Sequence, residues 1–318
     1  MRTPNRGMKK AAAAVTLGTL AVVASACSSN SSSTTTTTAA SSPTTTTTPP
    51  IPTTVIPTQP ANSAIAATVP AAIHSTGNLI VGMDASYPPS EFFASDGSTI
   101  VGMDADLSTA IGQTLGLNPK LVNATFTTII PGIASGKYGM GASSFTPTIV
   151  REKQVDFVNY FNAGEAFYIK SGGTVFTDTA QLCGHSVAVE SGTTEEKHAK
   201  EQGAKCTATG KGKVTILSFT TQTEANVAVS SGRADVGYVD SPVAAFVVAN
   251  SNGVFQNSGA PFNLSPYGLA VQKNSGMAAP VQAAVNLLIS NGVYHQILVK
   301  WGVQAGAITT ATLNGATS

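Results

Sequence analysis

Residues 143–151 (SSFTPTIVR) place small hydroxyl side chains, a proline and one arginine directly after a glycine-rich turn. Hydroxyl groups and unpaired backbone N–H groups collect where a helix begins, and they favour an anion there. The guanidinium group of Arg151 lies close enough to add a planar pair of charge-assisted donors. The stretch therefore predicts an anion receptor at a helix start. A capped surface helix with a solvated arginine is the alternative, and these residues alone do not decide between them.

Residues 1–26 have the pattern of a secretory signal, in which basic residues precede an apolar run at residues 11–23. Residues 24–27 (ASAC) resemble a lipobox, whose cysteine becomes the lipidated first residue of the mature protein. We expect export, removal of residues 1–26, and a lipid on Cys27 that anchors the protein to the outer face of the cytoplasmic membrane. Ordinary cleavage after Ala26, which leaves a free Cys27, is the alternative.

An uncharged tract of Ser, Thr, Pro and Ala runs from residue 28 to about residue 70. Such a composition buries too little apolar surface to offset the conformational entropy of the chain. We therefore expect residues 27–76 to form a disordered tether that begins at the lipidated cysteine. The folded part is expected to begin near Gly77.

The charge balance of the chain excludes some classes of partner. The sequence has 17 Lys and Arg against 16 Asp and Glu, whereas a nucleic-acid-binding protein needs a basic surface. No apolar stretch after the leader approaches the length of a membrane span. The four histidines lack the spacing of metal ligands, and no catalytic motif is present. We expect no cofactor, no metal and no catalytic set.

Two predicted strands end at an aspartate. The apolar residues 79–83 precede Asp84, and the apolar residues 236–239 precede Asp240. Ligands of α/β proteins bind at the carboxyl ends of the strands, so Asp84 is a candidate for a binding site. Capping of a following turn or helix is the structural alternative for each.

Two helix starts also carry information. The spacing of Leu107, Ile111 and Leu115 predicts a helix over residues 104–116, where Asp104 and Asp106 are expected to act as caps. Residues 192–194 (GTT) form a turn that opens another helix. Its hydroxyl and N–H groups offer a second place for an anion.

The motifs at residues 84–88, 143–151, 192–194 and 235–240, in this order, closely resemble those of the periplasmic amino-acid-binding proteins of ABC importers, solute-binding family 3. The resemblance covers about residues 77–302. It implies an α/β, two-lobed periplasmic-binding-protein type II fold with two hinge crossovers, expected at residues 170–173 and 261–267. The implied division is lobe 1 at residues 77–169, lobe 2 at residues 170–262, and the lobe 1 return with C-terminal helices at residues 263–318.

The resemblance also implies the roles of individual residues. Arg151, Thr146 and the turn at Thr193 and Thr194 correspond to the residues that hold the α-carboxylate of the ligand. Asp240 and Ser144 correspond to the residues that accept its α-ammonium group. The remaining implied ligand-binding residues are the aromatic walls Tyr87 and Phe126, the carboxylates Asp84 and Glu190 at the side-chain end, and Ser143.

The cysteines are consistent with an exported protein. If Cys27 is lipidated, Cys183 and Cys206 are the two that remain. Two remaining cysteines of an exported chain usually form a disulfide, so we expect a Cys183–Cys206 bond.

The expected function is capture of a free amino acid and delivery to the permease subunits of an ABC transporter. Two carboxylates at the side-chain end favour a cationic ligand, namely arginine, lysine, ornithine or histidine. Glutamine or asparagine is the alternative. An enzyme similar to cyclohexadienyl dehydratases, with Glu190 as its acid, and a sensor or adhesin that binds a partner protein are two further classes that the sequence leaves open.

Overall fold

The computed structural model describes residues 51–316. The predicted signal sequence, the lipidation at Cys27 and the first part of the tether lie outside these residues. Within residues 51–316, no helix has both the length and the apolar composition needed to cross a membrane.

One mixed sheet runs through the molecule in the order β5-β1-β6-β11-β7-β10-β8-β9, with β12 paired to β7. β1 is parallel to β5 and β6, and β8 is parallel to β9 and β10, so each half of the sheet has a parallel group. The strands are β1 (Asn78–Met83), β5 (Asn118–Asn123), β6 (Met140–Phe145), β7 (Val155–Lys170), β8 (Ser186–Glu190), β9 (Thr215–Phe219), β10 (Val236–Asp240), β11 (Phe255–Gln272) and β12 (Thr312–Leu313).

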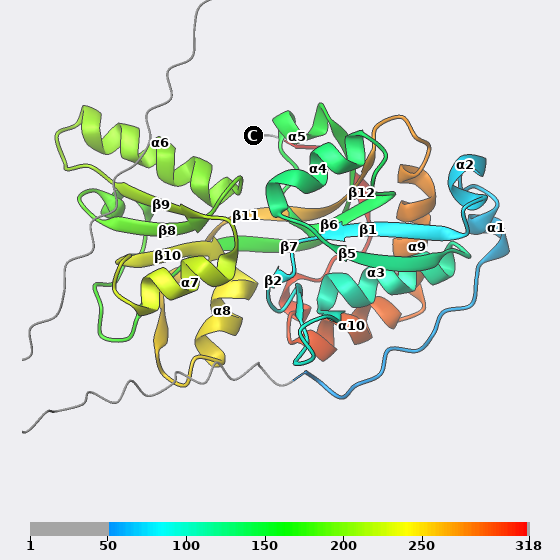
Figure 1. Cartoon of the computed structure of the whole chain (residues 1–318), viewed down its shortest axis with the longest axis horizontal. Helices are drawn as coiled ribbons and strands as arrows, with labels where there is room; N and C mark the ends of the chain where they lie inside the picture. Colours follow the sequence, from blue (N-terminus) through cyan, green and yellow to red (C-terminus); the bar gives the residue numbers. More distant parts are fainter. Residues whose placement is uncertain (1–50, 317–318) are drawn as a thin grey trace, which may run out of the picture. The chain divides into compact units, whose positions relative to one another are not determined.

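In lobe 1, helices cover both faces of the sheet (Figure 1). One face packs against α3 (Met103–Thr114), α9 (Ala278–Ser290) and α10 (Val293–Trp301). The other face packs against the short apolar helix α4 (Phe126–Ala134), which is followed by α5 (Ile149–Glu152). A small separate sheet comprises β2 (Ser86–Tyr87), β3 (Glu91–Phe93) and β4 (Ile100–Val101).

Lobe 2 has the same layering. Helix α6 (Thr194–Ala208) packs on one face of β8, β9 and β10, and α7 (Gln222–Ser230) and α8 (Ser241–Ala249) pack on the other (Figure 1). Two short 3-10 turns are η1 (Thr179–Leu182) and η2 (Gln304–Gly306). Because helices flank both faces, central strands such as β6 and β10 are buried on both sides.

The expected first hinge at residues 170–173 is misplaced. Strand β7 is continuous to Lys170, and its residues 166–169 already pack in the cores of lobe 2. Ala163 still belongs to the core of lobe 1, so the first crossing lies near residues 163–165. On β11 the pairing with β7 shifts register between Ser258 and Ser265, which marks the second crossing. Strand β7 runs without interruption through both lobes. Its sequence therefore does not show where the chain passes from one lobe to the other.

The predicted end of the tether at residue 76 is wrong, because residues 51–76 belong to the folded part of the protein. Residues 51–76 include the short helices α1 (Ser63–Ala66) and α2 (Ala71–His74), and they pack on lobe 1. Val69 is buried in its core, and the Gln59 backbone N–H donates to the Gln113 side chain at 2.8 Å. The few apolar residues of this segment become buried only through contact with lobe 1. The composition of the segment alone does not reveal that contact.

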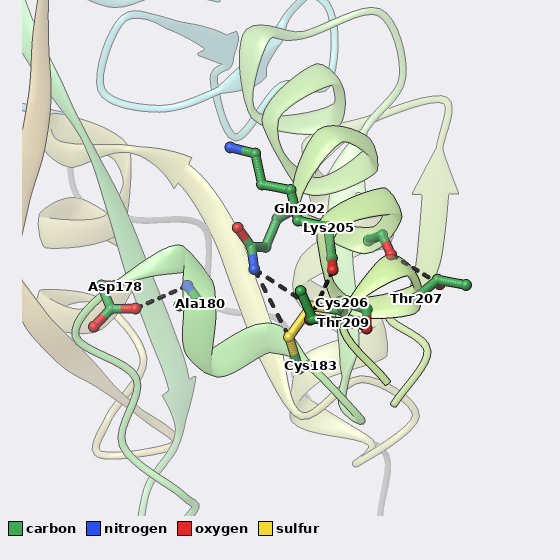
Figure 2. The surroundings of a disulfide bond; sticks show 9 residues. Asp178, Ala180, Cys183, Gln202, Lys205, Cys206, Thr207 and Thr209 are labelled. Atoms are coloured by element: carbon green, nitrogen blue, oxygen red, sulfur yellow. Dashed lines mark hydrogen bonds between the residues drawn. A yellow bond between two sulfur atoms is a disulfide. The ribbon is translucent and has the colours of Figure 1, made fainter. Parts of the chain in front are cut away.

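Cys183 and Cys206 are joined by a disulfide with a Cα–Cα distance of 5.4 Å, which fastens the end of η1 to the last turns of α6. Figure 2 shows Gln202 next to the bond, with its Nε2 at 3.3 Å from Cys206 Sγ. The bond closes a sequence separation of 23 residues.

We predict that replacing both cysteines by serine lowers the free energy of unfolding by about 3 kcal/mol, because the open chain regains the entropy of a loop of this size. Urea denaturation of the two proteins measures the difference. Intact mass after alkylation of the denatured, unreduced protein provides the direct check. Alkylation of both Cys183 and Cys206 without reductant would contradict the bond.

Candidate functional site

A narrow cavity of about 10 Å³ lies where β1, β6, β8 and β10 end. The carboxyl ends of these strands meet at one edge in each lobe, which is where α/β proteins place ligands. The cavity brings together every residue that the family resemblance named as ligand-binding, from both lobes. Its lining is Asp84, Tyr87, Phe126, Ser143, Ser144, Thr146, Arg151, Glu190, Thr193, Thr194, Glu195 and Asp240.

Arg151 is held at the start of α5. Thr148 caps this short helix by accepting a hydrogen bond from the Arg151 backbone N–H. The guanidinium donates from Nη1 to the Thr146 carbonyl at 2.8 Å and stands 5.3 Å from the centre of the Phe126 ring. Burial lowers the pKa of Arg151, while the nearby carboxyl groups of Glu195 and Asp240 oppose that shift. The arginine is therefore a fixed cation at the cavity wall.

The turn before α6 faces Arg151 from lobe 2. Nη2 of Arg151 donates to the Gly192 carbonyl at 2.9 Å, which is a direct contact between the lobes. Thr193 caps α6 by accepting from the Glu196 backbone N–H. Gly192 has φ +82°, and a Cβ there would lie 2.6 Å from Thr127 Cγ2, so this close approach requires glycine. The positive end of the α6 dipole and Arg151 therefore border the same part of the cavity.

Asp240 does not cap α8, because its side chain makes no hydrogen bond to that helix. Oδ2 instead accepts a hydrogen bond from Tyr87 Oη at 2.8 Å, across the lobes. Burial raises the pKa of Asp240 to about 6, against the opposing effect of this and other hydrogen bonds. The hydroxyl of Ser144, which has φ 48°, has no hydrogen-bond partner among the described residues. Both groups line the cavity.

Asp84 and Glu190 form a carboxyl pair between the lobes. Asp84 follows β1 and accepts from the Phe126 backbone N–H at 2.9 Å, whereas Glu190 is the last residue of β8. Burial raises the pKa of both, and for Glu190 the charge of Asp84 raises it further. Their carboxyl groups lie within hydrogen-bonding reach, and no donor of residues 51–316 reaches Oε1 of Glu190. Such a pair needs a proton or a cation between its members.

A second layer of buried acids fixes the lobe 1 half of the cavity. Ser143 Oγ accepts from the Asp84 backbone N–H and donates to Glu91 Oε1 at 2.7 Å, so its hydroxyl is already engaged. Asp104 does not cap α3, whose N-cap is Gly102 without a side-chain bond. Its carboxylate accepts from the Ser144 backbone N–H at 2.9 Å and from Tyr160 Oη. Both acids thus hold the end of β6 in place.

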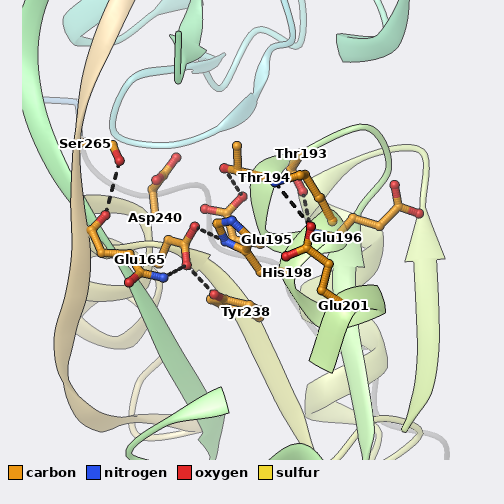
Figure 3. A network of polar contacts seen from close by, with 12 residues as sticks. Glu165, Thr193, Thr194, Glu195, Glu196, His198, Glu201, Tyr238, Asp240 and Ser265 are labelled. Carbon is orange, nitrogen blue, oxygen red and sulfur yellow. Dashed lines mark hydrogen bonds and ion pairs between the residues drawn. The ribbon is translucent and has the colours of Figure 1, made fainter. Parts of the chain in front are cut away.

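A polar network joins the crossing strands to α6 (Figure 3). Glu165 of β7 lies 2.7 Å from His198 Nδ1 and accepts hydrogen bonds from Tyr238 and from Asn263 of β11. Both crossing strands are therefore linked to the helix that lines the cavity.

Sequence reasoning missed Glu195, Glu91 and Asp104 as parts of the site. Glu195 stands in the first turn of a helix, where an acid ordinarily complements the helix dipole, so its position gave no other signal. The sequence did place Glu195 directly after the turn at residues 192–194, and that position was the available indication that it belongs to the site. Within the described part of the chain, no cluster of three or more His, Cys, Asp or Glu side chains could hold a metal ion.

Comparisons with known proteins identify the family of the chain. Residues 79–304 match the model of the bacterial extracellular solute-binding proteins, family 3. The arginine-binding protein ArgT of Corynebacterium glutamicum is 34% identical over 251 residues, which is 79% of this chain and 82% of that protein.

Two solved structures of an ancestral arginine-binding protein also match, one bound to arginine and one to glutamine. Each is 35% identical and covers 71% of this chain and 98% of that chain, with TM-scores of 0.66 and 0.65. Their fold is the two-lobed α/β arrangement described above. The chain belongs to family 3 of the bacterial extracellular solute-binding proteins.

Proposed function

We propose that the protein captures a cationic amino acid, arginine foremost, between its lobes and delivers it to the permease of an ABC importer. One observation carries this proposal: the carboxyl pair of Asp84 and Glu190 shares a cavity with Arg151 and Asp240. One end of the cavity is thus suited to an amino acid's charged α-groups, and the other end to a positive side chain.

The α-groups of any amino acid fit the first end. The Arg151 guanidinium and the start of α6 complement a carboxylate, with Thr146, Thr193 and Thr194 close by. Asp240 complements the ammonium group, and Ser144 offers an unused hydroxyl oxygen. These contacts are common to all amino acids, so they carry no selectivity among side chains.

Selectivity comes from Asp84 and Glu190, with Tyr87 and Phe126 as aromatic walls. A guanidinium or ammonium group between the two carboxylates replaces the proton that they otherwise share, and the aromatic faces add cation–π attraction. An anionic side chain in the same place is repelled, and exclusion of water strengthens the repulsion. Binding of arginine by one relative and of both arginine and glutamine by the ancestral protein supports this ligand class and its neutral alternative.

Ligand binding also favours the closed form. Arg151 and Asp84 belong to lobe 1, whereas Asp240, Glu190 and the start of α6 belong to lobe 2. A single ligand satisfies both half-sites only when the lobes are together, so it shifts the population toward closure. We propose no catalytic step for Glu190. An assay with prephenate and arogenate tests this, and we expect no turnover of either.

We predict by calorimetry that arginine binds most tightly, glutamine less tightly and glutamate least. Asp84→Asn keeps the acceptor for the Phe126 N–H but removes one charge, so arginine affinity should fall at least about thirtyfold, by the 2–5 kcal/mol of a broken buried charge pair. Glutamine affinity should change much less. Tightest binding of glutamate by the wild-type protein would sink the assignment.

Arg151→Ala should weaken binding of arginine and of glutamine alike, each by at least about thirtyfold, because the ligand carboxylate loses its charged partner. Arg233→Ala is the matched control, since Arg233 is exposed and does not line the cavity. Circular dichroism checks that both variants fold. An Arg151→Ala protein that is folded and binds with unchanged affinity would move the carboxylate site elsewhere.

Attachment to the membrane is proposed to depend on a lipid on Cys27. Cys27→Ala should shift the protein from the detergent phase to the aqueous phase in a detergent partition of whole cells. The Cys183→Ser, Cys206→Ser double variant serves as control, because it removes cysteines without touching the leader. Retention of the Cys27→Ala protein in the detergent phase would reject lipidation as the anchor.

A further inference from the structure

Glu195 lines the cavity beside Asp240, and the proposed ligand contacts leave it without a role. Its side chain is 2% exposed, and Oε2 accepts a hydrogen bond from Thr194 Oγ1 at 3.2 Å. No N–H or O–H group of residues 51–316 donates to its Oε1. Figure 3 shows Glu195 between the start of α6 and Asp240, whose carboxyl group is within hydrogen-bonding reach.

The surroundings of Glu195 disfavour a second negative charge. Asp240 faces it from the end of β10, and Glu165 faces it from β7, where Glu165 is paired with His198. Arg151 is the nearby cation. Burial, Asp240 and Glu165 raise the pKa of Glu195 well above its ordinary value, in that order of size. The remaining titratable groups around it are hydroxyls, namely those of Tyr87, Tyr238 and Tyr267.

The charges of the bound ligand also favour the uncharged form of Glu195. Arg151 neutralises the α-carboxylate, and Asp240 neutralises the α-ammonium group. An ionised Glu195 would leave one unmatched negative charge in a part of the protein from which water is excluded, and such a charge is strongly unfavourable. A proton on Glu195 removes that charge and converts the repulsion of two carboxylates into a hydrogen bond.

We propose that Glu195 contacts the α-ammonium end of the ligand as an uncharged carboxylic acid, hydrogen-bonded to Asp240, and so keeps that end at a single negative charge. This inference rests on the proposed function. It adds a ligand-contacting residue, and it implies that closure on the ligand takes up a proton at Glu195.

The first test compares Glu195→Gln with Glu195→Ala by calorimetry with arginine. Glutamine has the shape and hydrogen-bonding capacity of the uncharged acid, so Glu195→Gln should restore most of the affinity that alanine loses. We expect Glu195→Ala to bind at least about tenfold more weakly, as for truncation of a buried hydrogen-bonding group, and Glu195→Gln to stay within about threefold of wild type. Glu201→Gln, an exposed position on the same helix paired with Lys197, is the control.

The second test measures the proton itself. In the open form a solvated glutamate has a pKa of about 4.3, so at pH 7.5 it is ionised and must gain a proton when the closed form raises its pKa. Titrations with arginine in phosphate and in Tris, whose ionisation enthalpies differ, give the number of protons taken up. Wild type and Glu201→Gln should take up more than Glu195→Gln, by as much as one proton. Because Glu195 must take up this proton on closure, its contribution to affinity falls as the pH rises above the pKa that Glu195 has in the open form.

The outcomes separate the two claims. If the wild-type protein binds neither arginine nor glutamine, the proposed function fails. If it binds arginine but Glu195→Gln loses as much affinity as Glu195→Ala, with no difference in proton uptake, Glu195 is ionised and only this inference is overturned. Unchanged affinity of Glu195→Ala would show that Glu195 does not contact the ligand.

Discussion

The cavity encloses more acid than base, and this constraint organises the rest of the structure. Four buried carboxyl groups and one half-buried guanidinium line it. Buried charges are tolerated only when they are paired or protonated. Asp84 faces Glu190 across the lobes, Asp240 faces Glu195 within lobe 2, and burial raises the pKa of all four carboxyl groups. In the proposed complex the ligand supplies the missing positive charges, so closure and recognition depend on the same groups.

The scaffold holds these groups at defined positions before a ligand arrives. Asp104 and Glu91 fix the end of β6, and Thr148 fixes Arg151 on α5. Glu165 connects both crossing strands to α6 through His198 and Asn263. The lobe 2 half of the cavity is therefore linked to the strands that connect the lobes. A site divided between two rigid halves loses little further order when it binds, which favours affinity.

Several residues have roles that their local sequence does not suggest. Asp104 and Glu195 both stand in the first turn of a helix, where an acid normally complements the dipole. The structure turns both carboxyl groups toward buried partners contributed by other elements. The composition of residues 51–76 likewise resembles that of the preceding tether, yet Val69 and Gln59 are buried against lobe 1. The hinge lies inside β7, because a strand that serves two lobes has no reason to break between them.

The sequence by itself determined the order of the motifs and, through their resemblance to a known family, the family, the α/β class and the cavity-lining side chains other than Glu195. It could do so because the motifs are local features at strand ends and helix starts, and such ends meet at one edge of the sheet in α/β proteins. Only the tertiary structure decided which carboxyl groups face each other, where the lobes cross, how far the folded part extends toward the N-terminus and that Glu195 enters the site. Those properties depend on burial and on distances between segments far apart in the chain, and no local pattern encodes either.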